Sequence, residues 1–482
     1  MRIRRQCALA VAVLVVFGCK STSTMQYRAT KPPAPAMAVE DLEGRKDVDD
    51  GTGAKRCSEL VLRNRSVEKF RAPNGEEFTI GVIELSDDGT LKSQEQHDEV
   101  FEEMKRVARA GDGAVIVTFV HGWHHRAKVC DENLSCFRRT MQGLVMRKGD
   151  RTNPGPVFGL YIGWRGESLR GEAGTLTFYN RKSTAQHVGS LGGKDLLLEL
   201  NKVQHELDTE VRQATGGKRW VNLVTVGHSF GGAFVYSAFE ALKAAEVASP
   251  ASAACNGVKP VREGIGDLVV LVNPAFEARR YRYFADDLTK PGTYSPEQRR
   301  VLLTVASEAD QAVGQAFPAG RSLWLAWHPW AWGHGSAEIH GLGHYPPYTT
   351  HRLDFKGAAA TPVPPAVLTN QERIVACDLT KEIQNDLVRA ECTCSYPVYK
   401  EGIETMRPSS VAKLEAMPGT NPDPHAPFIV VSAPGTLISG HNDIYNPNFI
   451  VFLIKTINEN LQGPGMPKSS AAMSPCKTAE LR

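Results

Sequence analysis

The segment WVNLVTVGHSFGGAFVYSAFEALKAAEVA (residues 220–248) constrains the fold more than any other part of the chain. A run typical of a buried strand ends abruptly at GHSFG (residues 227–231), and a helix-forming run follows directly. G-x-S-x-G between a strand and a helix predicts a tight turn that holds Ser229 above the carboxyl end of the strand. The turn is expected to require Gly227 and Gly231, because a Cβ at either position would clash with the neighbouring strand or helix. Ser229 is therefore the candidate nucleophile.

The surrounding sequence predicts an α/β fold. Strands that are apolar along most of their length indicate a mostly parallel sheet that is covered by helices on both faces. Such strands are expected at 76–85, 114–120, 156–164, 220–226, 266–276 and 299–310, with helices at 93–111, 135–149, 192–216 and 231–248.

The later part of the chain predicts an insertion before the last core strand. Residues 317–425 break the strand–helix rhythm and contain four tryptophans, at 324, 327, 330 and 332. These tryptophans indicate either the packed core of an inserted subdomain or an apolar lid over a lipid or acyl group. The expected divisions are a signal peptide at 1–18, a lipidated N-terminus and flexible tether at 19–55, the first part of the core at 56–316, the insertion and candidate lid at 317–425, the last part of the core at 426–462 and a C-terminal tail at 463–482.

The N-terminus has the pattern of an export signal. The basic segment MRIRR precedes the apolar run CALAVAVLVVFGC, which is too short to span a bilayer comfortably. Gly18-Cys19 resembles the bacterial lipoprotein signal, which implies acylation of Cys19 and a lipid-anchored location in the cell envelope, at the outer membrane or cell surface. A plain cleaved signal or a membrane-tethering helix are the alternatives. The Pro-, Ser- and Thr-rich residues that follow predict a flexible tether.

Charge and cysteine content bear on three further questions: nucleic-acid binding, disulfide bonds and zinc binding. The net charge is +3 and no basic block follows the first residues, so nothing indicates a nucleic-acid partner. Apart from Cys7 and Cys19, which belong to the signal segment, the chain has eight cysteines. An even number favours disulfides in an exported chain. Cys130 and Cys136 are close enough to close one loop, and Cys377 with Cys392 or Cys394 is a second candidate pair. A zinc site is less favoured, because the CTC spacing does not match a metal knuckle.

The strand–serine–helix segment resembles the α/β-hydrolase superfamily, in particular its serine esterases and lipases, over roughly residues 75–315 and 425–462. The resemblance implies an α/β-hydrolase fold and an oxyanion loop after an early strand. AVIVTFVHGWHH (residues 114–125) matches that loop. The oxyanion hole would be the backbone N–H groups of Trp123 and Phe230, the latter being the residue after the nucleophile.

The same resemblance implies the order nucleophile, acid, histidine along the chain. TVASEAD (residues 304–310) is similar to the family's acid loop and indicates Asp310, with Glu277 as the alternative one strand earlier. SGHNDIYNPNFIVFLIKTI (residues 439–457) resembles the family's final segment and indicates His441. His228, inside the turn, is expected to pack beneath the nucleophile rather than act as its base.

These residues predict a serine hydrolase that works through an acyl-enzyme without metal or organic cofactor. The resemblance implies that its substrate is a carboxylic ester, either a small molecule or a lipid. Metal binding by the histidines at 121, 124 and 125, or by those at 334, 340 and 344, is the less favoured interpretation. Two other classes stay open. One is a non-catalytic envelope lipoprotein with the same fold, and the other is an amidase or peptidase with the same triad.

Overall fold

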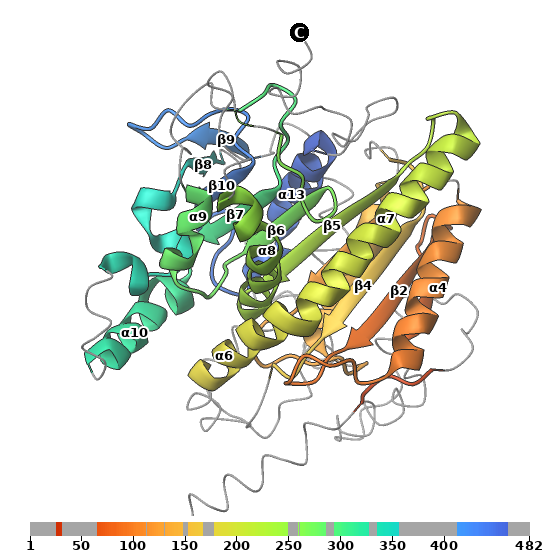
Figure 1. Ribbon diagram of the computed structural model, residues 1–482, viewed down its shortest axis with the longest axis horizontal. Helices are drawn as coiled ribbons and strands as arrows, with labels where there is room; N and C mark the ends of the chain where they lie inside the picture. The colour runs from red at the N-terminus through yellow and green to blue at the C-terminus, as the bar shows by residue number, and fades with distance from the viewer. Residues whose placement is uncertain are drawn as a thin grey trace, which may run out of the picture.

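The computed structural model is an α/β fold in which helices cover both faces of a single sheet (Figure 1). It describes residues 26–30, 65–111, 113–129, 131–147, 153–166, 178–248, 259, 261–285, 294–326, 335–355 and 412–460. Structural statements below refer to these residues.

The sheet has ten strands in the order β1-β2-β4-β3-β5-β6-β7-β10-β8-β9. The strands are β1 (Val67–Arg71), β2 (Glu77–Glu84), β3 (Ala114–Val120), β4 (Val157–Gly163), β5 (Val221–His228), β6 (Leu268–Val272), β7 (Leu302–Ser307), β8 (His351–Asp354), β9 (Lys413–Ala416) and β10 (Phe428–Ala433). All neighbours pair in parallel except the two edge strands, since β1 runs antiparallel to β2 and β9 antiparallel to β8. The carboxyl ends of the central strands therefore meet at one edge of the sheet.

Helices cover both faces of this sheet. They are α4 (Gln94–Ala110), α5 (Glu132–Met146), α6 (Phe178–Val188), α7 (Lys194–Thr215), α8 (Phe230–Ala248), α9 (Arg282–Ala285), α10 (Phe317–Ala326) and α13 (Pro447–Asn460). Strand β3 shows how the two cores divide. Ile116 and Val120 face a cluster built with α4, α7 and α8, whereas Val115 and Val117 face one built with α5 and α13. In Figure 1, α4, α7 and α8 lie on the near side of the sheet and α13 on the far side.

Part of the predicted insertion enlarges the sheet. Strand β8 pairs in parallel with β10 and β9 follows it at the edge, so these pieces of 317–425 extend the core outward. Helix α6 lies in a stretch for which the sequence predicted no element. The tryptophans at 327, 330 and 332 lie outside the described residues, so the lid stays a prediction.

Residues 26–30, which lie within the predicted tether, dock on the core and are not free of it, whereas the rest of the predicted tether lies outside the described residues. Arg28 is only 1% exposed, and its guanidinium contacts the carboxylate of Glu68 at 2.6 Å. Arg138 approaches the other side of Glu68 at 2.9 Å. Burial alone would raise the pKa of Glu68, but the two guanidinium groups hold it below its usual value. The tether was predicted from the low content of large apolar residues, and that criterion does not detect a buried ion pair.

The predictions of a signal segment, of an acylated Cys19 and of disulfides concern residues that lie mostly outside the described ranges. Among the cysteines only Cys136 is described, buried on α5, so both candidate disulfides stay predictions. Cys19 and the signal segment are also outside. None of the helices in the described part combines the length and the apolar character needed to cross a bilayer.

The Arg28–Glu68–Arg138 cluster gives a stability prediction. Glu68→Gln removes the charge that compensates two buried guanidinium groups, so the free energy of unfolding should fall by about 3–5 kcal/mol. Glu77→Gln breaks an exposed pair with Arg71 and should cost less than about 1 kcal/mol. Urea unfolding of both variants measures the difference. Equal losses would contradict the anchoring role of Glu68.

Candidate active site

Strand β5 ends in a strained turn that carries Ser229. The φ angle of Ser229 is 54°, in the left-handed region that non-glycine residues rarely adopt. A Cβ at Gly231 would lie 2.0 Å from the carbonyl oxygen of Val120, and one at Gly227 would lie 2.6 Å from the oxygen of Gly231. The predicted reason for both glycines is therefore confirmed: the turn packs too closely against β3 and α8 for any side chain.

The structure brings Ser229, Asp310 and His441 into one hydrogen-bonded line. The Oγ of Ser229 lies 2.7 Å from Nε2 of His441, and Nδ1 of His441 lies 2.8 Å from Oδ2 of Asp310. Ser229 follows β5, Asp310 follows β7 and His441 follows β10, so parallel strands deliver all three to the same edge. The Asp310 side chain is fully buried, whereas that of His441 is 18% exposed. The imidazole is thus partly accessible from solvent, whereas Ser229 is only 5% exposed and the carboxylate is shielded from water.

The environment of Asp310 keeps its carboxyl group ionised. Burial disfavours the charge, but the His441 imidazole and a hydrogen bond from the backbone N–H of Val313 hold the pKa of Asp310 below its usual value. The ionised carboxylate accepts a hydrogen bond from the Nδ1–H of His441. That leaves Nε2 of the neutral ring as an acceptor for the Ser229 hydroxyl proton.

Two buried side chains hold the backbone of His441. Its carbonyl oxygen accepts hydrogen bonds from Nε2 of His228 and from Nδ2 of Asn273, both at 2.9 Å. Asn273 has a φ of 45° and accepts from the N–H of Ser307 at 2.8 Å, which ties β6 to β7. The Ser307 hydroxyl in turn donates to the carbonyl of Ile438. His228 thus supports the backbone of the histidine loop, and the ring nitrogen that lies against Ser229 Oγ belongs to His441.

The predicted oxyanion donors lie beside the serine. A Cβ at Gly122 would be 2.9 Å from Cβ of Ser229, so the Gly122–Trp123 peptide runs next to the nucleophile. Phe230 is the first residue of α8, and the first N–H groups of a helix have no acceptor within it. The rings of Trp123 and Phe230 are 6.1 Å apart. This arrangement can present two backbone donors and a helix N-terminus to a negatively charged oxygen.

The histidines after β3 have structural partners. His121 is fully buried and stacks on Trp164 and Tyr161. Its Nε2 accepts from the N–H of Trp164 and its Nδ1 lies 2.9 Å from the carbonyl of Gly122. Burial lowers its pKa to about 4. His125 contacts Asp131, the N-cap of α5. Across the described ranges, no group of three His, Cys, Asp or Glu residues has a metal-binding arrangement.

Sequence reasoning missed an aromatic wall, the cluster formed by the rings of Trp123, Phe178 and Phe230. Phe178, the first residue of α6, packs its ring 5.2 Å from that of Trp123 and 4.8 Å from that of Phe230. The signal for Phe178 was weak, because α6 has little amphipathic pattern. Asn273 was also missed, although the Asn-Pro pair directly after an apolar strand in LVNPAF marks a turn at the carboxyl edge.

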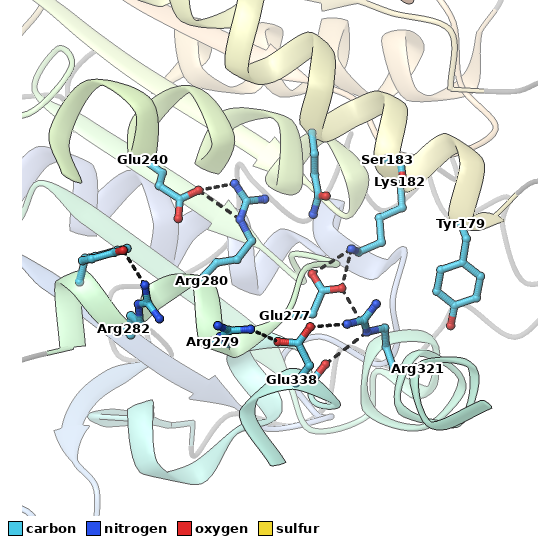
Figure 2. Close-up of a pocket in the computed structure, with 12 residues that line it drawn as sticks. Tyr179, Lys182, Ser183, Glu240, Glu277, Arg279, Arg280, Arg282, Arg321 and Glu338 are labelled. Carbon is cyan, nitrogen blue, oxygen red and sulfur yellow. Dashed lines mark hydrogen bonds and ion pairs between the residues drawn. The ribbon is translucent and has the colours of Figure 1, made fainter. Parts of the chain in front are cut away.

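Glu277, the alternative acid, is engaged elsewhere. Figure 2 shows its carboxylate between Lys182 and Arg321. The distances are 2.7 Å to Lys182 and 3.2 Å to Arg321. Burial opposes its charge, but these two cations hold the pKa of Glu277 below its usual value. Asp310, rather than Glu277, is therefore the residue placed to orient His441.

His228 gives a pH-dependent prediction. Burial lowers its pKa in the folded protein to about 3, and its Nδ1 has no partner within the described residues. As the pH falls below about 6.5, the unfolded chain binds a proton at this position and the folded chain does not, so stability decreases. His228→Gln keeps a donor for the His441 carbonyl but cannot titrate. Between about pH 7 and pH 4.5, the wild type should lose about 2–3 kcal/mol more unfolding free energy than this variant. Parallel pH profiles in urea unfolding would contradict the prediction.

Comparisons with known proteins found no relative that bears on this site. The chain matches no family model, no curated protein and no solved structure.

Proposed function

We propose that this protein is a serine hydrolase of the α/β-hydrolase type that cleaves carboxylic esters. The observation that carries the proposal is the line from Ser229 Oγ through His441 to Asp310, with distances of 2.7 and 2.8 Å. The strained turn after β5 and the chain order serine, aspartate, histidine support the assignment to this fold type.

The proposed reaction has two steps. In the first, Nε2 of His441 takes the Ser229 proton while Oγ bonds to the ester carbonyl carbon, and the negative charge moves to the carbonyl oxygen. The N–H groups of Trp123 and Phe230 stabilise that oxygen. When the intermediate collapses, the C–O bond to the alcohol breaks and the leaving oxygen takes the proton from His441. In the second step, water attacks the acyl-enzyme, His441 takes its proton, and Ser229 leaves with that proton restored.

The aromatic wall supports an apolar acyl group. Trp123 and Phe178 are half-buried and pack against the buried ring of Phe230, and Trp123 and Phe230 are the two predicted oxyanion residues. Half-buried aromatic rings are suited to hydrocarbon rather than charged groups. A lipid or other apolar ester fits the proposed acylation of Cys19, which would hold the protein on a membrane of the cell envelope.

Enzyme assays with a matched serine control test the proposal. The folded protein should hydrolyse p-nitrophenyl esters and react with a fluorophosphonate probe. Ser229→Ala should abolish labelling and lower kcat/KM by at least about 10³-fold, because the nucleophile is lost. Ser190→Ala removes a remote hydroxyl that donates to the carbonyl of His187, and should leave both unchanged.

The outcome also separates the rival classes. Faster cleavage of matched anilides than of esters would favour an amidase or peptidase. Absence of both labelling and hydrolysis in folded wild type would favour a non-catalytic envelope protein.

A further inference from the structure

A cavity lies away from the serine. It encloses about 470 Å³ between α6, the 3₁₀ helix η6 (Ala278–Tyr281) with α9, α10, and the 3₁₀ helix η9 (Ser336–Glu338). None of Ser229, Asp310 and His441 lines it. The volume is within the usual range for small-molecule sites, about 300–1,000 Å³. The proposed hydrolytic chemistry uses none of its charged side chains.

The lining of this cavity is highly charged, and positive side chains outnumber negative ones. Five cationic side chains face three carboxylates, which leaves an excess of two positive charges. The cations are Lys182, Arg279, Arg280, Arg282 and Arg321, and the carboxylates are Glu240, Glu277 and Glu338. Figure 2 shows Lys182, Arg279 and Arg321 gathered around Glu277 and Glu338, and Arg280 directed at Glu240. Arg282 points away from these carboxylates.

Every carboxylate of the lining is already bound to a cation. Glu277 contacts Lys182 and Arg321, as described above. Glu338 contacts Arg321 at 2.5 Å and Arg279 at 3.4 Å, and Glu240 pairs with Arg280. The carboxylates therefore hold the cations in place without neutralising the cavity.

Two arginines at the cavity retain hydrogen-bonding capacity. A guanidinium carries five N–H donors. Arg279 makes one long contact with Glu338, and its side chain is 35% exposed. Arg282 donates to the hydroxyl of Tyr283 and stacks on that ring. Arg280, between them in the chain, is fixed by Glu240 and Ser237 and lies over the ring of Tyr236.

We propose that this cavity binds a small organic phosphate, in which a dianionic phosphate group contacts Arg279 and Arg282. A dianion matches the excess of two positive charges, and guanidinium groups bind phosphate oxygens in bidentate geometry. The cavity is much larger than a phosphate group alone, so the ligand carries an organic part against Tyr179, Ser183 and Gln186. Binding at this cavity does not require that Ser229 be a nucleophile.

Isothermal titration calorimetry on the full chain tests the proposal. Glycerol 3-phosphate should bind saturably and at least about tenfold more tightly than inorganic phosphate, because it also fills the organic part. Glycerol should not bind. Arg279→Gln/Arg282→Gln should weaken glycerol 3-phosphate binding at least about tenfold, since charge-assisted hydrogen bonds are lost. Arg109→Gln, which removes an exposed arginine paired with Glu210, should bind as wild type.

Two further titrations distinguish a lipid phosphate from a soluble one and test whether the ligand binds at the serine site instead. Short-chain phosphatidic acid at monomeric concentrations should bind more tightly than glycerol 3-phosphate if the ligand is a lipid headgroup, and less tightly if it is a soluble metabolite. Ser229→Ala should bind glycerol 3-phosphate as wild type. No saturable binding to folded protein, equal affinity of the double variant and the Arg109→Gln control, or inorganic phosphate binding as tightly as glycerol 3-phosphate would overturn the proposal.

Discussion

The two hydrogen bonds of the His441 ring are the interaction on which the site depends, because they join segments that are far apart in the chain. Ser229 and His441 are separated by 212 positions, yet Oγ and Nε2 lie 2.7 Å apart. The parallel sheet makes this meeting possible, since β5, β7 and β10 all end at one edge. The strain at Ser229 and the buried charge at Asp310 both carry a cost in stability, and close packing around the turn sustains them. Asn273 and His228 add a direct hold on the backbone of His441.

Buried ion pairs attach the outer segments to this core. Glu68 holds Arg28 and Arg138 and so fastens the N-terminal segment to the sheet. Glu277 links Lys182 of α6 to Arg321 of α10. Breaking such a pair leaves a buried charge uncompensated, so each pair specifies where its segment docks. The second of these networks also frames the cationic cavity. The same charges that link α10 to α6 therefore also border the proposed phosphate site.

The sequence predicted the elements that carry strong local patterns. Strand β5, its glycines and the helix after it were readable because a tight turn allows few residue types. Asp310 and His441 were indicated by the resemblance to the order of residues in the α/β-hydrolase superfamily. Arg28 was missed because its docking depends on Glu68 and Arg138, 40 and 110 positions away, and no local pattern reports such a pair. Strands β8 and β9 are four residues each and half-exposed, so they lack the apolar run that marks the central strands. Asn273 acts through one amide on a distant carbonyl, which only the folded chain reveals.

A crystal structure of the fluorophosphonate-treated protein tests the central claim most directly. The account predicts phosphorus bonded to Ser229 Oγ, with the phosphoryl oxygen about 2.7–3.1 Å from the backbone nitrogens of both Trp123 and Phe230. The ring of His441 should remain hydrogen-bonded to Asp310. A phosphoryl oxygen directed away from these two nitrogens, or an adduct on another residue with Ser229 unmodified, would contradict it.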